Sequence, residues 1–193
     1  MTPVRAAALL GVIASLLAGY GLLTTPVFAI RTIDVPTLQY TARDTLLGWL
    51  GIEAGTNAFR LSTAGLAQRL EAIPAIDTAS VSVALPDRLV VGVAERTPIL
   101  AWRVGDVTFL VDRTGMLFHW LPSGSDGTSG LPTVVDRRSL STIALSVGSP
   151  LDPVDLDAAT RLASLKPADI GSSAAALSVT VTDSDGFVVT TKT

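Results

Sequence analysis

Apolar and polar positions alternate most regularly in residues 76–98. Two runs, 81–85 and 89–93, place an apolar side chain at every second position with small side chains between them, which is typical of strands with one buried face. Pro86 and Asp87 separate the runs, and both residue types favour the central positions of a tight turn. The pattern therefore predicts a β-hairpin whose apolar face needs a cover.

Two amphipathic helices are predicted before the hairpin. The first begins at Thr41, whose hydroxyl suits an N-cap, and ends at Gly51, which suits a left-handed C-cap. The second begins after Ser62 and ends before Pro74. The apolar positions are Leu46, Leu47 and Leu50 in the first helix and Leu66, Leu70 and Ile73 in the second. A strand at 27–35 precedes them, so the order β-α-α-β-β predicts a compact α+β unit with both helices on one face of the sheet.

Short strands follow this unit. Asp112 and Gly115 suit the first and last positions of a turn, and Asp152 suits the N-cap of a helix with Pro153 at its first position. The predicted strands are residues 99–104, 109–111, 116–120, 134–135, 177–181 and 187–189, and the last two form a hairpin. The second part of the chain is therefore predicted to be a mostly antiparallel β-domain with one helix.

The N-terminal part is an unbroken apolar segment. Residues 6–23 are all apolar or small, and no residue between Arg5 and Arg31 is charged. As a helix this run is about 27 Å long, close to the thickness of the hydrocarbon core of a bilayer. We therefore predict a single transmembrane helix at residues 6–26, with residues 1–5 in the cytoplasm and the remainder outside it.

A cleavable signal peptide is the main alternative for this segment. A cut after Ala29 would have small residues at its −3 and −1 positions, Val27 and Ala29. However, the apolar run is longer than a usual signal core, and the cut would sever the predicted first strand. These points favour an uncleaved anchor. A buried core helix is disfavoured because the segment has no polar face.

Three stretches of the chain resemble a known bacterial family. They read FAIRTIDV at residues 28–35, GTNAFRLS at 55–62 and LEAIPAIDTASVSVALPDRLVVGVAERTPILAW at 70–102. This sequence resembles the POTRA domain of FtsQ/DivIB-type cell division proteins, and VDRTGMLF at 111–118 resembles the start of the family's second domain. The resemblance implies a POTRA domain at 27–97 and an FtsQ/DivIB-like β-domain at 98–193. Family members continue with another helix and a final strand, so we expect the C-terminal part of that domain to be missing here.

Candidate chemistry is sparse. The chain has no cysteine and one histidine, His119, which argues against thiol chemistry and an ordinary zinc site. Its 14 basic residues are outnumbered by 17 acidic ones, so nucleic-acid binding is not expected. The acidic run 183–186 fits a hairpin turn better than a calcium loop. We expect no catalytic constellation, no metal and no cofactor, and therefore no enzyme.

The resemblance implies a scaffold rather than a catalyst. It implies a membrane protein of the division septum that binds FtsB/DivIC-type and FtsL-type proteins, and septal peptidoglycan synthases. An open sheet edge offers unpaired backbone groups to which a partner segment adds as a strand. Our candidate edge is the hairpin at 177–191, and the candidate partner-binding residues are Phe187, Val189, Thr191, Glu95 and Arg96. We predict that Glu95 and Arg96 form a solvated strand end.

Two other classes remain open. A POTRA unit in a chaperone of polypeptide transport or outer-membrane assembly would use the same edge pairing, but such proteins carry several POTRA repeats and a long barrel. An extracytoplasmic hydrolase would need paired carboxylates, or a nucleophile and a base, that converge in a cleft.

Overall fold

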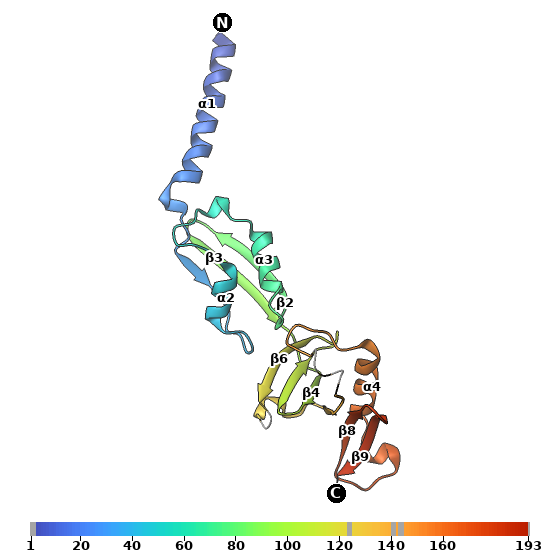
Figure 1. Ribbon diagram of the computed structural model, residues 1–193. Coiled ribbons are helices and arrows are strands. Elements are labelled where there is room, and N and C mark those ends of the chain that lie inside the picture. Colours follow the sequence, from blue (N-terminus) through green and yellow to red (C-terminus); the bar gives the residue numbers. More distant parts are fainter. Residues whose placement is uncertain (1–2, 123–124, 140–141, 143–144, 193) are drawn as a thin grey trace. The chain divides into compact units, whose positions relative to one another are not determined.

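The computed structural model describes residues 3–122, 125–139, 142 and 145–192 (Figure 1). It divides into two compact units, one formed by residues 1–72 and 78–94 and the other by residues 73–77 and 95–193. Part of the predicted tail at 1–5 lies outside the described residues, as do residues 123–124, 140–141, 143–144 and 193. Each unit is described by itself.

The first helix, α1, spans Pro3–Thr24, and none of its residues is buried. It is long and apolar enough to cross a membrane. The 3₁₀ helix η1 follows at Pro26–Phe28, where the Thr25 hydroxyl accepts a hydrogen bond from the Val27 amide. The first strand, β1, is therefore only Thr32–Asp34. The predicted strand start at residue 27 is wrong, because a proline at the first position favours the tight helical turn.

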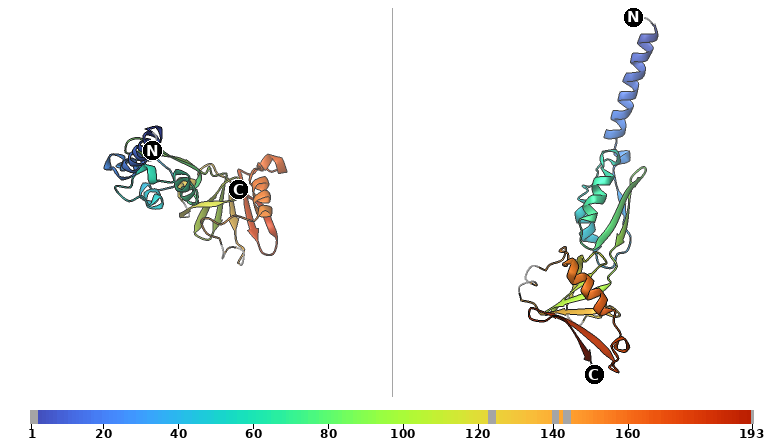
Figure 2. Two further views of the ribbon diagram at one scale, coloured as in Figure 1. Left: turned by 90° about the horizontal axis from the view of Figure 1, so that it is seen from above. Right: turned by 90° about the vertical axis from the view of Figure 1, so that its right-hand side faces the viewer.

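A three-stranded sheet covered by two helices forms the rest of the first unit. Its elements are α2 (Arg43–Leu50), η2 (Ala58–Arg60), α3 (Thr63–Glu71), β2 (Ile76–Ala84) and β3 (Arg88–Glu95). The strand order is β1-β3-β2, with β1 parallel to β3. Both α2 and α3 lie on one side of this sheet (Figure 2). The predicted β-α-α-β-β order is confirmed.

The core of this unit contains the predicted apolar positions. Leu46 and Leu50 of α2, Leu66 and Leu70 of α3, and Leu89 and Val91 of β3 are all buried. Four further predicted positions are only half-buried, namely Leu47, Val81, Val83 and Val93. Leu85 lies in the turn and is 58% exposed. The peptide bond between Leu85 and Pro86 is cis. The alternating pattern of the hairpin therefore predicts the inward face of its strands, but it does not extend to the tip.

The helix ends follow the predicted capping with one correction. Gly51 has φ 58° and donates its amide to the Leu47 carbonyl, as a left-handed C-cap does. The Ser62 hydroxyl accepts from the Gly65 amide at 3.2 Å, which confirms the predicted N-cap. Thr41 is not an N-cap, since α2 begins at Arg43 after Ala42. Its hydroxyl is instead buried, and it has no hydrogen-bond partner among the residues that the structure describes.

We expect Ser62→Ala to lower the stability of α3 by about 1 kcal/mol, because it leaves an amide of the first helical turn without its acceptor. Hydrogen exchange of the α3 amides in the detergent-solubilised chain measures this change. Ser82→Ala is the matched control, since Ser82 is exposed on β2. Equal exchange in the two variants would show that the cap does not stabilise the helix.

In its described residues, the second unit is a six-stranded mixed sheet with one α-helix. Its strands are β4 (Leu100–Val104), β5 (Val107–Val111), β6 (Leu117–Pro122), β7 (Thr133–Asp136), β8 (Ala176–Thr182) and β9 (Gly186–Lys192). The order is β6-β5-β4-β7-β8-β9, where β7 is parallel to β4 and β8 and the remaining pairs are antiparallel. The helix α4 spans Pro153–Ala163 and is capped by Asp152 as predicted. Two 3₁₀ helices lie in the connections of the sheet: η3 (Asp126–Thr128) between β6 and β7, and η4 (Pro167–Ile170) between α4 and β8.

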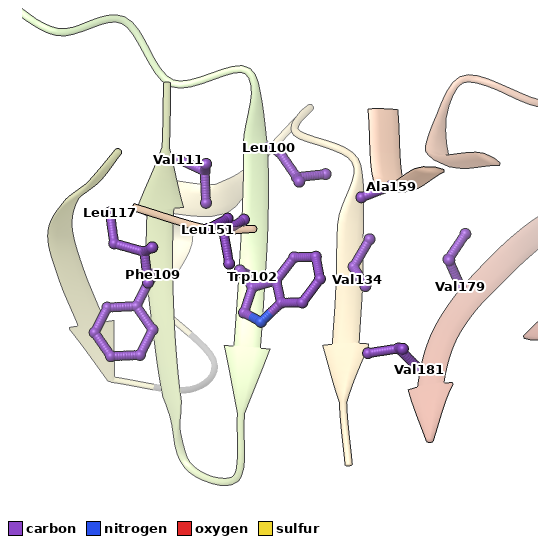
Figure 3. Packing of buried hydrophobic residues seen from close by; sticks show 10 residues of the cluster. All are labelled: Leu100, Trp102, Phe109, Val111, Leu117, Val134, Leu151, Ala159, Val179 and Val181. Carbon is purple, nitrogen blue, oxygen red and sulfur yellow. The ribbon is translucent and has the colours of Figure 1, made fainter. Parts of the chain in front are cut away.

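Trp102 lies at the centre of the core of the second unit (Figure 3). Its side chain is fully buried on β4, the strand between β5 and β7. Ala159 of α4 is buried in the same cluster, so the helix covers this face of the sheet. The other members are Leu100, Phe109, Val111, Leu117, Val134, Leu151, Val179 and Val181.

Candidate partner-binding edge

The strand β9 lies at one end of the six-stranded sheet. It pairs along its whole length with β8, from Ala176 opposite Lys192 to Thr182 opposite Gly186. The turn between them is the predicted one, and Gly186 closes it with φ 66°, a conformation that glycine adopts without steric cost. Within the part of the chain that the structure describes, no strand pairs with the other side of β9. The predicted hairpin is confirmed, and it provides an open edge.

The side chains of β9 differ in what they offer to a partner. Phe187 and Val189 are half-buried and pack against the core of the second unit. The Phe187 ring meets Trp102 edge to face, with 6.4 Å between ring centroids. Thr190 and Thr191 are exposed. Phe187 and Val189 therefore hold the strand on the core, whereas its open side presents backbone groups.

Arg96 is not the solvated strand end that we expected. Its side chain is only 15% exposed, and its Nε donates to the Pro74 carbonyl at 2.9 Å. Its Nη1 donates to Asp112 Oδ2 at 2.6 Å and to Asp77 Oδ1 at 3.5 Å. Because these partners are distant in the sequence, the periodicity of the strand gave no sign of them. Glu95 is half-buried, and its predicted role in partner binding stays a prediction, as does that of Arg96.

Asp112 organises the turn that the sequence predicted. Its Oδ1 accepts hydrogen bonds from the Thr114 amide at 2.8 Å, the Thr114 hydroxyl at 2.7 Å and the Met116 amide at 2.9 Å. Burial alone would raise the pKa of this carboxyl, but the hydrogen bonds from Thr114, Arg96 and Met116 outweigh burial and lower it. Asp112 is therefore ionised wherever the protein is folded near neutral pH.

A second buried carboxylate, Asp136, escaped the sequence analysis. It accepts from Trp102 Nε1 at 3.2 Å and from Arg138 Nη2 at 2.8 Å, and Arg138 also contacts Asp155 of α4 at 2.7 Å. The hydrogen bonds that Arg138 donates to Asp136 raise the pKa of Arg138, and they outweigh burial, which acts in the opposite direction. The sequence signal that could have identified Asp136 is its position at the end of an apolar strand. The network joins β7 to α4 and to the central tryptophan.

The second unit also holds His119, the single histidine of the sequence. His119 of β6 is half-buried, and burial lowers its pKa against the opposing charge of Glu95, so it is neutral near pH 7. Across the described residues, no group of three or more histidine, aspartate or glutamate side chains is placed to hold a metal ion. The most developed feature is the open edge of β9, whose unpaired backbone groups are suited to strand addition.

The elements define the class of this protein. A helix with the length of a membrane span, a β-α-α-β-β unit and a mixed β-sheet unit follow one another in the order that the resemblance implied. Residues 28–96 match the family model described as a POTRA domain of FtsQ type. The resemblance seen in the sequence is therefore confirmed, and residues 28–96 form a POTRA domain of FtsQ type.

Curated relatives extend the similarity beyond the POTRA domain. The chain is 31% identical over 171 residues to the cell division protein FtsQ of Mycobacteroides abscessus, covering 86% of this chain and 51% of the relative. It is 32% identical over 123 residues to FtsQ of Syntrophotalea carbinolica, covering 64% and 43% respectively. For FtsQ of Chloroflexus aggregans the identity is 26% over 166 residues, covering 82% and 59%. The chain thus spans about half the length of these relatives.

Proposed function

We propose that this protein is a membrane-anchored scaffold of bacterial cell division that binds other division proteins outside the cytoplasm. The observation that carries the proposal is the similarity to cell division proteins FtsQ, which covers 86% of the chain and so includes the second unit as well as the POTRA domain. The open edge of β9 supports binding rather than turnover, so we propose no enzymatic activity.

The proposed location follows from α1. A helix of 22 residues is about 33 Å long, enough for one crossing of a bilayer. We propose that α1 is the anchor, with its N-terminus in the cytoplasm and the two folded units outside, and that the protein concentrates at the division septum. A fluorescent protein fused to the N-terminus should form a band at midcell in dividing cells. A signal spread evenly around the envelope would contradict the septal location.

The proposed partners are proteins of the FtsB/DivIC and FtsL type, together with septal peptidoglycan synthases. We propose that a segment of an FtsB/DivIC-type partner adds to β9 as a further strand, using its unpaired backbone groups. Phe187 and Val189 fix the strand on the core, and Thr191 lies on the exposed part of the same strand. Glu95 and Arg96 belong to the proposed contact only as a secondary surface, because Arg96 already has internal partners.

Two proline variants test the proposed edge, since charged substitutions at Phe187 or Val189 would also damage the core. Successive N–H groups of a strand point to opposite sides, so of Thr190→Pro and Thr191→Pro one removes an N–H that faces β8 and the other an N–H that faces outward. The outward variant should lose most co-precipitation of the FtsB/DivIC-type protein while the thermal unfolding of the chain is unchanged. The inward variant is the matched control, and it should unfold at a lower temperature.

Unchanged co-precipitation with both variants would exclude strand addition at β9. Loss of the partner only where unfolding also changes would mean that the fold, rather than the open edge, is what the partner requires. Midcell localisation is measured separately, so a failure of the edge assignment does not decide the septal one.

A further inference from the structure

The loop before η2 is fixed to the end of α1. The Asn57 side-chain amide donates to the Leu22 carbonyl at 2.9 Å and to the Thr25 carbonyl at 3.4 Å. Its Oδ1 accepts from the Phe59 amide at 2.9 Å, and Asn57 itself is buried. These bonds satisfy carbonyls that the end of a helix leaves free. Phe59 and Arg60 are therefore held at a defined place beside the last turn of α1.

Exposed apolar side chains gather at this same end of the first unit. Val27 is 56% exposed and Phe59 is 46% exposed, and the Phe59 ring meets Phe28 edge to face at 5.0 Å. The tip of the β2–β3 hairpin reaches the same end, because the Arg31 amide donates to the Asp87 carbonyl at 2.9 Å. That tip carries Leu85, which is 58% exposed. We call Val27, Phe28, Phe59, Arg60 and Leu85 the α1-proximal cluster.

Arg60 supplies a positive charge within this cluster. Nearby arginines already have acidic neighbours, Arg31 at 4.0 Å from Asp87 and Arg88 at 3.0 Å from Asp34. Arg60 is exposed and makes no ion pair with any residue that the structure describes. It lines an open hollow of about 560 Å³ together with Leu23, Thr25 and Asn57. The hollow combines a free guanidinium with apolar and hydroxyl side chains.

The length of α1 places the cluster at the surface of a bilayer. The helix α1 is about 33 Å long, only slightly longer than the hydrocarbon core of a bilayer, which is about 30 Å thick. The C-terminal end of a spanning α1 therefore lies near the headgroups. Tyr20, which is 68% exposed one turn before that end, is a residue type enriched at this level. Apolar side chains followed by an arginine match the change from hydrocarbon to phosphate across this boundary.

We propose that the α1-proximal cluster binds the outer surface of the bilayer, with Val27, Phe59 and Leu85 at the edge of the hydrocarbon and Arg60 on a phospholipid phosphate. The inference rests on the membrane anchoring proposed above. It adds a second membrane contact, which holds the POTRA domain against the lipid instead of leaving it on a free tether. The ligand is the lipid headgroup layer, not a soluble phosphate.

The absence of cysteine allows a clean distance measurement in the full chain. Ala54→Cys places a fluorophore on an exposed position just before the Asn57 loop, and Thr78→Cys places it at the end of β2 far from the hairpin tip. The chain is reconstituted into nanodiscs of phosphatidylcholine and phosphatidylglycerol that contain a quencher on the headgroups. Quenching should be strong for the label at residue 54 and weak for the label at residue 78.

Substitutions in the α1-proximal cluster distinguish contact of the POTRA domain with the lipid from simple attachment through α1. Arg60→Gln should lower the ratio of docked to undocked POTRA domain about fivefold, the effect of one basic group at an anionic surface, and Arg60→Gln with Leu85→Ser should lower it further. Val154→Ser is the matched control, because Val154 is 75% exposed on α4 in the second unit. Unchanged quenching at residue 54 in both cluster variants would overturn the proposal, since the tether alone would then explain the proximity.

A chain that does not float with lipid vesicles would overturn the proposal together with the anchoring on which it rests. Soluble inorganic phosphate that abolishes the quenching, without any dependence on phosphatidylglycerol, would show a phosphate site unrelated to the membrane and would equally contradict it. Neither result bears on septal localisation or on the β9 edge, which have their own measurements.

Discussion

Asp136→Ala should lower the free energy of unfolding of the second unit by about 3–5 kcal/mol, the usual cost of removing one partner of a buried ion pair. The Asp136 side chain is completely buried, whereas that of Arg138 is 16% exposed. The substitution leaves the Trp102 Nε1–H without its acceptor in the core, and it leaves Arg138 with Asp155 alone. The guanidinium also lies 5.9 Å from the Trp102 ring, so its displacement disturbs the centre of the core.

Hydrogen exchange of the β4, β7 and β8 amides in the detergent-solubilised chain measures this loss locally, which is necessary because the chain has two units and need not unfold in one step. Asp157→Ala is the matched control. Its pair with Arg161 is 62% and 77% exposed, and such pairs contribute about 0.3–0.5 kcal/mol. If both variants exchanged alike, the Asp136 network would not stabilise the core.

This network also bears on the proposed edge. Phe187 of β9 packs on Trp102, and Trp102 donates to Asp136. We therefore expect Asp136→Ala to loosen β9 and to weaken the capture of an FtsB/DivIC-type partner, although Asp136 itself lies on β7. The loss of binding should follow the loss of protection on β9.

Asp112→Ala should lower the free energy of unfolding by about 3 kcal/mol. It removes the ion-pair partner of the half-buried Arg96 and the acceptor of two backbone amides. Arg96 would keep the Pro74 carbonyl and the longer contact with Asp77. Thermal unfolding followed by tryptophan fluorescence measures the change. Asp34→Ala is the control, since its pair with Arg88 is 47% and 56% exposed and contributes below about 1 kcal/mol. An equal effect of the two substitutions would contradict the assignment.

The same residue predicts a pH dependence with a definite sign. Hydrogen bonds from Thr114, Arg96 and Met116 outweigh burial and lower the pKa of Asp112 in the folded protein. A lowered pKa stabilises the fold above the unfolded value of about 3.9, and this contribution is lost as the pH falls through the folded value. The stability difference between the wild-type chain and Asp112→Asn should therefore be constant near neutral pH and shrink below about pH 4. A difference that grew on acidification would contradict this.

Most of the local structure follows from short-range patterns in the sequence. Alternation placed the hairpin and the strands after it, because side chains in a strand point to opposite faces in turn. Ser62, Gly51 and Asp152 marked helix ends through hydrogen bonds that reach only a few residues along the chain. The apolar length of α1 and the POTRA resemblance likewise came from contiguous residues, and both are borne out.

The partners of the charged residues and the identity of the edge strand depend on long-range contacts, which are visible only in the folded chain. The sequence predicted a solvated Arg96, but in the fold its side chain bonds Asp112 and the Pro74 carbonyl. Asp136 accepts a hydrogen bond from Trp102, which lies 34 residues earlier in the chain. The parallel pairing of β7 with β4 and β8, which leaves β9 at the end of the sheet, also joins segments far apart in the chain. Periodicity reports which face of an element is apolar, but it carries no information about which distant segment meets that face or pairs with its edge.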